Sequence, residues 1–487
     1  MVSAGVAAAV LLVGAGVGEA VRMGLSPAPS LRHRPIVNAA VVCPGFFSSA
    51  SQAETTFSVA TPSTQTASAP TVSSPPATLA ELTGARKVRH THRESNTMTA
   101  LRIPGGSAPP LVGRVAGALA AGFTVQQVTE VTGSQSRELS GVSCAKSDNE
   151  FWFLGASGAT SHRDQLHLIN GESSQAQVDV DVYGPNGSID TSLGQGVLLA
   201  PGERKTLFVT AMAPDTPVVA LHVRSREGRL ATAVYDQETE DGASRGGDWL
   251  PATASPSRRL TVPGIPNGVI SAQLFLLPLA GNDGVVKLKL ISTSGAFVPA
   301  GLETVPVSEN EVTSVELGSV LRGEPAAVVI DSDVPVVAGM RITRGSGEQS
   351  PEIAYLAAVP ALEGPATVVG NRTDDSFSAT LLLSAPGSAA QVRVTPLAAD
   401  AAGGEVVQVA AGATSVVMLK PASGTAPYAV VVAPLSDSGP VYGARLLAKQ
   451  SSERSLLTVQ PLISLPTTVA LPEVTPNPSA GTQSLRQ

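Results

Sequence analysis

The chain has 487 residues, of which 43% are hydrophobic, 15% charged and 3% aromatic, and its net charge is −7. The positive mean hydropathy excludes a wholly disordered chain, and the length excludes a single small domain. The acidic balance disfavours a nucleic-acid-binding protein, because phosphate binding needs clustered cations.

The first segment, residues 2–18, contains no charged residue until Glu19. This length is near the lower limit for a membrane-spanning helix and also fits the apolar core of a signal peptide. The segment resembles a glycine-rich nucleotide-binding turn, but Pro27 and Pro29 interrupt the helix that such a motif requires. We therefore expect residues 1–23 to be a cleaved signal or a retained membrane anchor, and the protein to be extracytoplasmic.

The sequence contains two cysteines, Cys43 and Cys144. In an oxidising compartment an even pair is most simply one disulfide. Closing a loop of about 100 residues would stabilise the fold by ~4–5 kcal/mol on the chain-entropy model. The alternative is two free buried thiols in a cytosolic protein.

Residues 48–80 are rich in Ser, Thr, Pro and Ala and carry one charge, Glu54. Such a composition predicts a linker or an elongated loop, because it offers little apolar surface to bury. A basic patch follows, with His90 and His92 among its cations. The patch predicts either a solvated face or contact with an anionic envelope polymer. The candidate polyanion-binding residues are Arg86, Lys87, Arg89 and Arg93.

Alternating apolar and polar residues dominate from about residue 150. Val178, Val180 and Val182 alternate with Asp179 and Asp181, which is typical of a half-buried strand. Groups of such strands begin at 165, 273 and 378, at intervals of roughly 105–110 residues. Short strands separated by frequent turns predict β-sandwiches of immunoglobulin-like size.

The predicted fold class is all-β, with tandem immunoglobulin-like sandwiches after an N-terminal helix and a disulfide-closed β-rich region. The predicted organisation is a signal or anchor at 1–23, an N-terminal β-rich region at 24–150, sandwiches at 151–255, 256–362 and 363–476, and a polar tail at 477–487. Each sandwich ends in a similar joint, an apolar strand followed by a proline-rich crossover. The last joint, 455–479, has no further sandwich after it, so we expect its strand to pair back on the third sandwich.

Serine-based chemistry has one candidate, Ser143-Cys144-Ala145-Lys146, which is followed directly by the tripeptide 147–149. These match the S-x-x-K and S-D-N motifs of penicillin-binding proteins, but there the two motifs come from separate elements that converge on a pocket. Adjacent residues of one chain segment do not converge in that way. We therefore expect no catalytic residue.

Metal-binding residues are also sparse. His162, Asp164 and His167 could approach one another at a strand end, and the loop 236–241 carries carboxylates without the glycine and final acid of a calcium loop. His90 and His92 would share a strand face, but the cations around them repel a metal ion. The sequence therefore predicts no metal site and no cofactor.

Residues 137–157, 246–266 and 43–45 resemble the conserved pattern of a family of uncharacterised exported actinobacterial proteins, a domain of unknown function. The resemblance lies in the Cys-then-Trp-Phe-Gly pattern, the Trp-Pro and Pro-Gly-x-Pro joint, and the first Cys-Pro-Gly. It implies a secreted or envelope location, an N-terminal signal or anchor, and a Cys43–Cys144 bridge. It implies no activity.

These observations predict a non-enzymatic, exported cell-envelope protein that serves as a structural spacer or as a binding and adhesion module. Its partner would be an envelope polymer or protein, with a membrane contact through the N-terminal helix if that segment is retained. One alternative is an accessory factor that binds anionic envelope glycan through the basic patch. Another is an envelope hydrolase with an unrecognised carboxylate pair.

Overall fold

A computed structural model of the chain describes residues 31–48, 52–62, 74–83, 86–133, 137–240, 243–279, 281–345, 351–398, 403–424, 427–450 and 455–472. Strands make up most of this described chain, and its helical residues are confined to one turn, α1 (Val209–Met212), and to short 3-10 segments. The all-β prediction is therefore confirmed. Residues 1–23 and 477–487, predicted to hold the signal or anchor and the tail, lie outside the described residues. None of the described helices has the length and apolarity needed to cross a membrane.

The chain divides into two units. The smaller is a two-stranded antiparallel ribbon of β1 (Leu31–Pro35) and β37 (Thr468–Pro472). The large unit, Ile36–Thr467, holds the remaining described strands.

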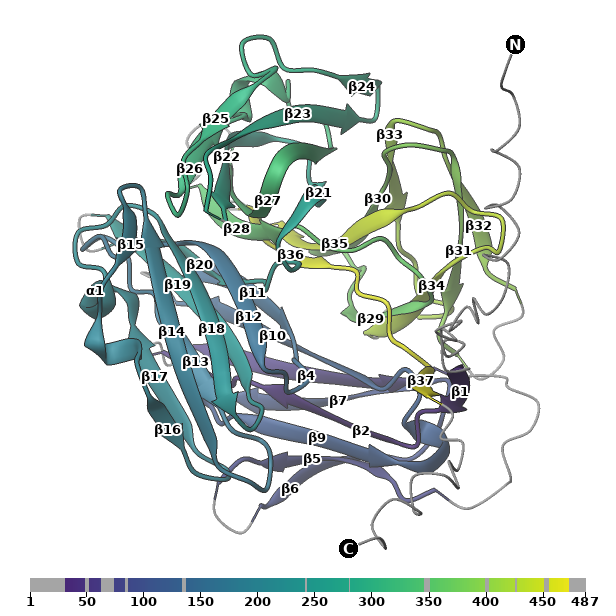
Figure 1. The fold of residues 1–487 in the computed structure, drawn as a ribbon. Helices are drawn as coiled ribbons and strands as arrows, with labels where there is room; N and C mark the ends of the chain where they lie inside the picture. Colours follow the sequence, from purple (N-terminus) through teal and green to yellow (C-terminus); the bar gives the residue numbers. More distant parts are fainter. Residues whose placement is uncertain are drawn as a thin grey trace, which may run out of the picture. The chain divides into compact units, whose positions relative to one another are not determined.

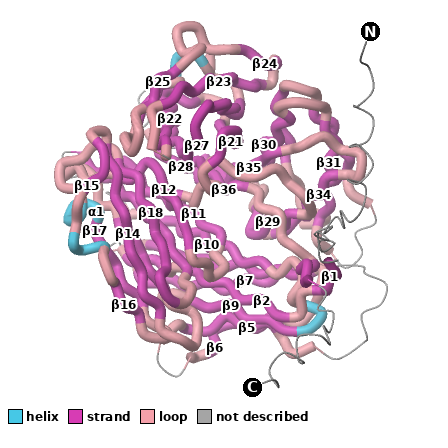
Figure 2. Tube along the Cα trace, viewed as in Figure 1, coloured by secondary structure: helices cyan, strands magenta, loops and turns pink. Residues whose placement is uncertain are grey.

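Strand pairing in the large unit stays within four consecutive stretches of chain, which Figures 1 and 2 show in ribbon and tube form. We name them the N-terminal stretch (38–143), the first stretch (150–250), the second stretch (257–357) and the third stretch (366–461). Whether these stretches are repeats of one immunoglobulin-like unit, as the sequence predicts, stays a prediction.

The N-terminal stretch forms two four-stranded sheets, β2-β9-β5-β6 and β11-β10-β4-β7, and the small pair β3-β8. Its elements are β2 (Asn38–Cys43), β3 (Phe46–Phe47), β4 (Ala53–Thr61), β5 (Ala77–Glu81), β6 (Val88–His92), β7 (Thr97–Pro104), β8 (Ser107–Ala108), β9 (Leu111–Ala116), η1 (Gly117–Leu119), β10 (Thr124–Thr132) and β11 (Arg137–Ser143).

The interpretation of residues 48–80 as a linker or loop is wrong for β4 and β5. β4 is a central strand between β10 and β7, and its Phe57 is fully buried. Its polar residues are also accommodated, since the hydroxyls of Thr55 and Thr129 lie 3.0 Å apart across the sheet. Threonine is well suited to a pleated strand when a neighbour pairs its hydroxyl. The composition alone therefore underestimated the tendency of this segment to form strands.

The first stretch also forms two sheets, β12-β18-β14-β15 with β16 beside β14, and β17-β13-β19-β20. Its strands are β12 (Glu150–Ala156), β13 (Gln165–Ile169), β14 (Ala176–Gly184), β15 (Gly187–Ile189), β16 (Val197–Leu199), β17 (Arg204–Phe208), β18 (Val219–Glu227), β19 (Ala231–Glu240) and β20 (Ala243–Leu250), with η2 (Ser192–Gly194) before β16. Val178, Val180 and Val182 of β14 are buried, as their alternation predicts.

The second stretch forms one eight-stranded sheet around β27, which pairs with β21 and β23 in its first half and with β22 and β28 in its second half. Its elements are β21 (Ser257–Ile265), β22 (Val269–Pro278), β23 (Gly284–Ser292), β24 (Gly295–Phe297), β25 (Val305–Val307), β26 (Thr313–Glu316), η3 (Gly318–Val320), β27 (Ala326–Arg344) and β28 (Glu352–Ala357).

The third stretch forms the sheets β29-β34-β31-β32 and β33-β30-β35-β36. Its strands are β29 (Ala366–Asn371), β30 (Phe377–Ala385), β31 (Ala390–Pro396), β32 (Glu405–Val409), β33 (Ala413–Met418), β34 (Tyr428–Pro434), β35 (Tyr442–Gln450) and β36 (Ser455–Pro461). β36 pairs with β35, so the first strand of the last joint returns to the third stretch as expected, whereas its second strand, β37, pairs with β1.

The last strands of the four stretches meet one another. β11 contacts β20, β20 contacts β28, β28 contacts β36, and β36 contacts β11, which closes a cycle. We call these four strands the ring strands; their labels lie near one another in Figure 1. β11, β20 and β36 are edges of their own sheets, and each is covered by its neighbours in the cycle.

Each ring strand also completes the core of the preceding stretch. Trp249 of β20 packs into the core of the N-terminal stretch, and Tyr355 of β28 packs into that of the first stretch. Val459 of β36 joins the core of the second stretch, and Leu139 of β11 joins that of the third. Burying a large apolar side chain contributes about 1.5–3 kcal/mol, so the four cores stabilise one another in a closed cycle.

Buried polar groups link the ring strands. The Asp248 carboxylate on β20 accepts hydrogen bonds from the Gly141 amide of β11 (2.9 Å) and the Thr458 hydroxyl of β36 (3.1 Å). A side chain at Gly141 would not fit, since its Cβ would lie 2.9 Å from the Thr458 hydroxyl. Burial, followed by the Glu138 charge, raises the pKa of Asp248 well above its ordinary value.

Arg445 of β35 is fully buried beside the ring and donates hydrogen bonds to Gln126 (3.1 Å) and Gln460. Burial lowers the pKa of Arg445 to about 10. These hydrogen bonds come from Nη2 and offset part of the desolvation cost of the buried cation, whereas Nε and Nη1 of Arg445 have no hydrogen-bond partner.

Candidate functional site

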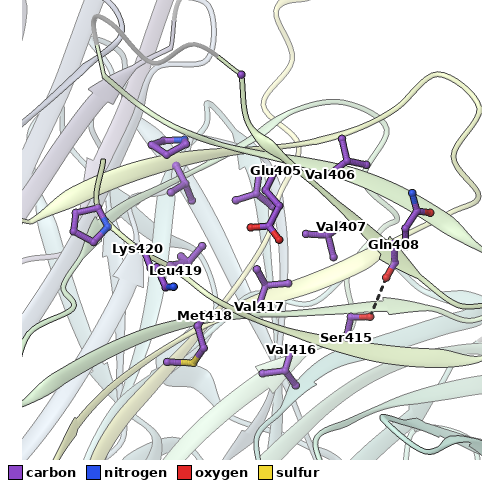
Figure 3. Close-up of a pocket in the computed structure, with 15 residues that line it drawn as sticks. Glu405, Val406, Val407, Gln408, Ser415, Val416, Val417, Met418, Leu419 and Lys420 are labelled. Carbon is purple, nitrogen blue, oxygen red and sulfur yellow. Dashed lines mark hydrogen bonds between the residues drawn. The ribbon is translucent and has the colours of Figure 1, made fainter. Parts of the chain in front are cut away.

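The third stretch leaves the outer edges of its two sheets apart. β32 ends one sheet and β33 ends the other, and an open cleft of about 710 Å³ lies between them. Figure 3 shows the side chains of Val407 and Val417 in this cleft, which we call the edge cleft.

Exposed apolar side chains flank the edge cleft. Val406, Val416 and Met418 are 38%, 44% and 56% exposed. They alternate with Val407 and Val417, which pack against the core of the third stretch. The strands therefore keep the period of a half-buried strand, yet their outward positions carry apolar residues in place of the usual polar ones.

The two ends of the edge cleft differ in polarity. At one end the Ser415 hydroxyl donates to the Gln408 carbonyl (3.4 Å), close to the tight turn that joins the strands. At the other end Glu405 and Lys420 line the cleft with opposite charges (Figure 3). Each edge strand is paired on one side among the described strands, β32 with β31 and β33 with β30. Unpaired strand edges offer main-chain donors and acceptors to an extended ligand.

A second open cleft, of about 680 Å³, lies beside β9. Arg114, Lys146 and Arg229 line it together with one acid, Glu172. Burial and then the charge of the nearby Arg86 lower the pKa of Arg114. We call this feature the basic groove; its excess of cations fits an anionic ligand.

Whether the four predicted polyanion-binding residues form one site stays a prediction, and two of them have described neighbours. Arg89 pairs with Glu81 (2.8 Å), which reduces its free charge, and Arg86 lies near Arg114. The interleaved histidines have structural partners, since His90 and His92 both contact the Thr99 hydroxyl (2.8 and 3.0 Å). Arg86 of the predicted patch lies near the basic groove, since its charge acts on Arg114 there.

Cys43 and Cys144 form a disulfide. Cys43 ends β2, and Cys144 follows the ring strand β11, so the bond ties the ring to the opposite sheet of the N-terminal stretch. The sequence prediction for these residues is confirmed, and the described chain holds no free cysteine.

Of the three residues singled out for metal chemistry, His162 and Asp164 stay together in the structure and His167 does not join them. The Nδ1 atom of His167 contacts the Thr206 hydroxyl (3.0 Å), whereas His162 and Asp164 instead meet Asp236. Sequence reasoning placed Asp236 in a separate loop. The sequence does not reveal the strand pairing that places His162 opposite Glu238 on β19, and this pairing brings Asp236 to His162.

A model of a family of unknown function, DUF5719, matches residues 99–423. The chain belongs to the DUF5719 family. No curated protein matches the chain. The matched region includes Cys144, the edge strands β32 and β33 that flank the edge cleft, and Arg114, Lys146 and Arg229 of the basic groove, whereas Cys43 and Arg86 lie outside it.

Family membership in a domain of unknown function agrees with the resemblance found in the sequence. It assigns no reaction, ligand or compartment to the DUF5719 chain. The candidate residues that sequence reasoning missed are the apolar edge of β33 and the cations Arg114, Lys146 and Arg229. Their positions in the sequence are far apart, and pairing of β9 with β2 and β5 gives Arg114 its place at the groove.

Proposed function

We propose that the protein is a non-catalytic binding module that acts outside the cytoplasm, with the edge cleft as its binding site. The observation that carries this proposal is the contrast between covered ring strands and the exposed apolar edges of β32 and β33. The Cys43–Cys144 disulfide supports an oxidising compartment. A cycle of mutually completed cores favours a rigid scaffold for binding over an extended spacer.

The occupant that best fits the edge cleft is an extended, partly apolar segment of a partner protein. Such a segment can add to β32 or β33 through main-chain hydrogen bonds, while Val406, Val416 and Met418 contact alternate side chains. Glu405 and Lys420 at the open end fix the direction of the segment, because they offer charges of opposite sign.

The test is selection of random linear peptides on the immobilised full chain, with the double variant Val406→Asp/Met418→Asp as counter-selection. Selected peptides that alternate apolar residues, bind the parent and lose at least tenfold affinity for the variant would support the proposal. Equal binding to both proteins, or no selected sequence, would contradict it.

The compartment is tested by fractionating the native host and determining the mature N-terminus by mass spectrometry. Export predicts protein outside the cytoplasm with both cysteines protected from thiol reagents. Intact cytosolic protein with two reactive thiols would overturn this part of the proposal.

A second candidate function, binding of anionic envelope glycan, is favoured by the basic groove. Arg114 donates a hydrogen bond to the Gly171 carbonyl, so Lys146 and Arg229, which are exposed, are the better test positions. Neutralising both as glutamine should weaken salt-sensitive retention on purified anionic polysaccharide. Neutralising the exposed Arg258 and Arg393 is the matched control, and equal loss in both variants would reject a site at the groove.

A further inference from the structure

A histidine and two buried carboxylates converge where the first stretch meets the second. His162 and Asp164 lie in the segment before β13, and Asp236 lies on β19. Main-chain hydrogen bonds hold this segment against β19, from the Arg163 amide to the Gln237 carbonyl (2.9 Å) and from the Thr239 amide to the Ser161 carbonyl (2.8 Å). These main-chain hydrogen bonds, arranged as between two paired strands, hold the three side chains of the cluster in place.

The inner atoms of the cluster face one another. His162 Nδ1 lies 2.9 Å from Asp236 Oδ1 and 3.8 Å from Asp164 Oδ1. The three donor atoms all lie within 4.8 Å of one another. Ligands of Zn²⁺ bind at about 2.0–2.2 Å in a tetrahedral arrangement, which separates neighbouring donor atoms by roughly 3–3.5 Å.

The outer carboxylate oxygens are already occupied. Asp236 Oδ2 accepts a hydrogen bond from the Tyr355 hydroxyl, and Asp164 Oδ2 accepts one from the Ser157 amide (2.7 Å). Asp164 Oδ1 is fully buried and has no hydrogen-bond partner. Donors that bind the outer oxygens in this way orient carboxylates in metal sites and leave the inner oxygens for the ion.

The charge of the site fits a dication. Asp164 and Asp236 are fully buried, and the neighbouring ion pair of Arg341 and Glu238 cancels its own charge. The two carboxylates therefore leave a net charge of −2 when His162 is neutral.

We propose that His162 Nδ1 and the Oδ1 atoms of Asp164 and Asp236 bind a divalent transition-metal ion, for which Zn²⁺ is the best match. One nitrogen and two oxygen donors suit Zn²⁺ better than Ca²⁺ or Mg²⁺, which prefer oxygen ligands throughout. His162 is 13% exposed and gives the ion access to solvent, where water completes the coordination. The proposal replaces the sequence-based expectation that no metal site exists.

His222 provides a matched control within the same stretch. It also has two carboxylate neighbours, with Glu150 2.8 Å from its Nε2 atom and Asp181 3.6 Å from its Nδ1 atom. These carboxylates flank opposite nitrogens of one ring, so they do not converge on a common point. The ring is also stacked on Trp152 at 3.6 Å.

The experiment uses the full chain stripped of metal with EDTA and titrated with Zn²⁺ by calorimetry and thermal unfolding. The parent should bind one Zn²⁺ and gain about 3–5 °C in Tm at saturating metal. His162→Gln should lose this response, and His222→Gln should retain it. Co²⁺ should give visible absorption bands in the parent and none in His162→Gln.

Absence of stoichiometric Zn²⁺ binding would overturn the proposal. Equal responses of His162→Gln and His222→Gln would overturn it too, because binding would then lie elsewhere. His162→Gln is the primary variant since His162 is the least buried ligand; Asp164→Asn, which preserves volume, is the second and should also lose binding.

Discussion

The sheets of this protein end in two kinds of edge strand. The ring strands β11, β20 and β36 are covered by one another and carry a buried polar linkage through Asp248. The outer edge strands β32 and β33 stand apart across the edge cleft and expose Val416 and Met418. Edge strands are normally covered, charged or short, because an open apolar edge recruits other chains.

The contrast separates stability from recognition. A covered edge loses its capacity to bind, and its side chains contribute to two cores at once, as Ile353 and Leu356 on opposite faces of β28 do. An open edge contributes little to the fold and remains available to a ligand. Substitutions at ring strands should therefore reduce stability, while substitutions at β32 and β33 should change binding.

The largest stability effect is expected at the disulfide that anchors β11. Replacing Cys43 and Cys144 with alanine releases a closure spanning 101 residues and should cost about 4–5 kcal/mol of unfolding free energy on the chain-entropy model. Urea unfolding of the double variant and of the reduced parent measures the effect. A loss below about 1 kcal/mol in both would contradict a stabilising role.

The next effect is expected at Asp248, which links three ring strands. Asp248→Leu removes its hydrogen bonds to the Gly141 amide and the Thr458 hydroxyl and leaves these donors buried, so it should cost about 2–4 kcal/mol. Asp248→Asn retains an acceptor oxygen and serves as the control, with a loss under about 1.5 kcal/mol. Equal losses for the two variants would show that the carboxylate does not link the ring.

The free energy of unfolding should also depend on pH through His167. Its imidazole lies 5.7 Å from the indole of Trp249 on the ring strand β20. Burial, followed by the Arg204 charge, lowers the pKa of His167 to about 3. The unfolded chain binds a proton below pH ~6.5 while the folded chain does not, so the stability from this group is lost as pH falls. Relative to His167→Gln, the parent should lose about 1.4 kcal/mol per pH unit between pH 6 and pH 4. If the unfolding free energies of the two proteins depended on pH in the same way, the lowered pKa of His167 would be refuted.

The smallest stability effect is expected at the open edge. Met418→Ser should change the unfolding free energy by no more than about 0.5 kcal/mol, because Met418 is 56% exposed. Chemical denaturation measures the change, with the buried Leu383 of β30 as the contrast: Leu383→Ala should cost about 2–5 kcal/mol. A large loss for Met418→Ser would place β33 among the structural edges.

Several features of the fold follow from local sequence. The alternation of Val178, Val180 and Val182 predicts a half-buried strand, and β14 buries all three. The cysteine pair and the return of β36 to the third stretch were also predictable, whereas the pairing of β37 with β1 was not. Composition failed for β4, because a threonine such as Thr55 reads as polar until a neighbouring strand supplies the partner for its hydroxyl.

The candidate sites were less predictable. The basic patch was sought in consecutive residues, but the basic groove draws Arg114, Lys146 and Arg229 from separate elements. The metal candidate was likewise sought within one segment, whereas Asp236 comes from the strand that pairs beside His162. Local spacing carries no information about which strand lies next to which.

By itself, the sequence determined that this chain forms half-buried strands joined by turns, since side-chain alternation is a property of neighbouring residues. Only the tertiary structure decided which strand edges are covered. Closing the cycle from β36 to β11 joins residues about three hundred positions apart, whereas β32 and β33 each pair on one side only among the described strands, and β33 also contacts β23, β24 and β27 of the second stretch. Burial of apolar surface between stretches determines this outcome, and such burial depends on the packed assembly of all four stretches.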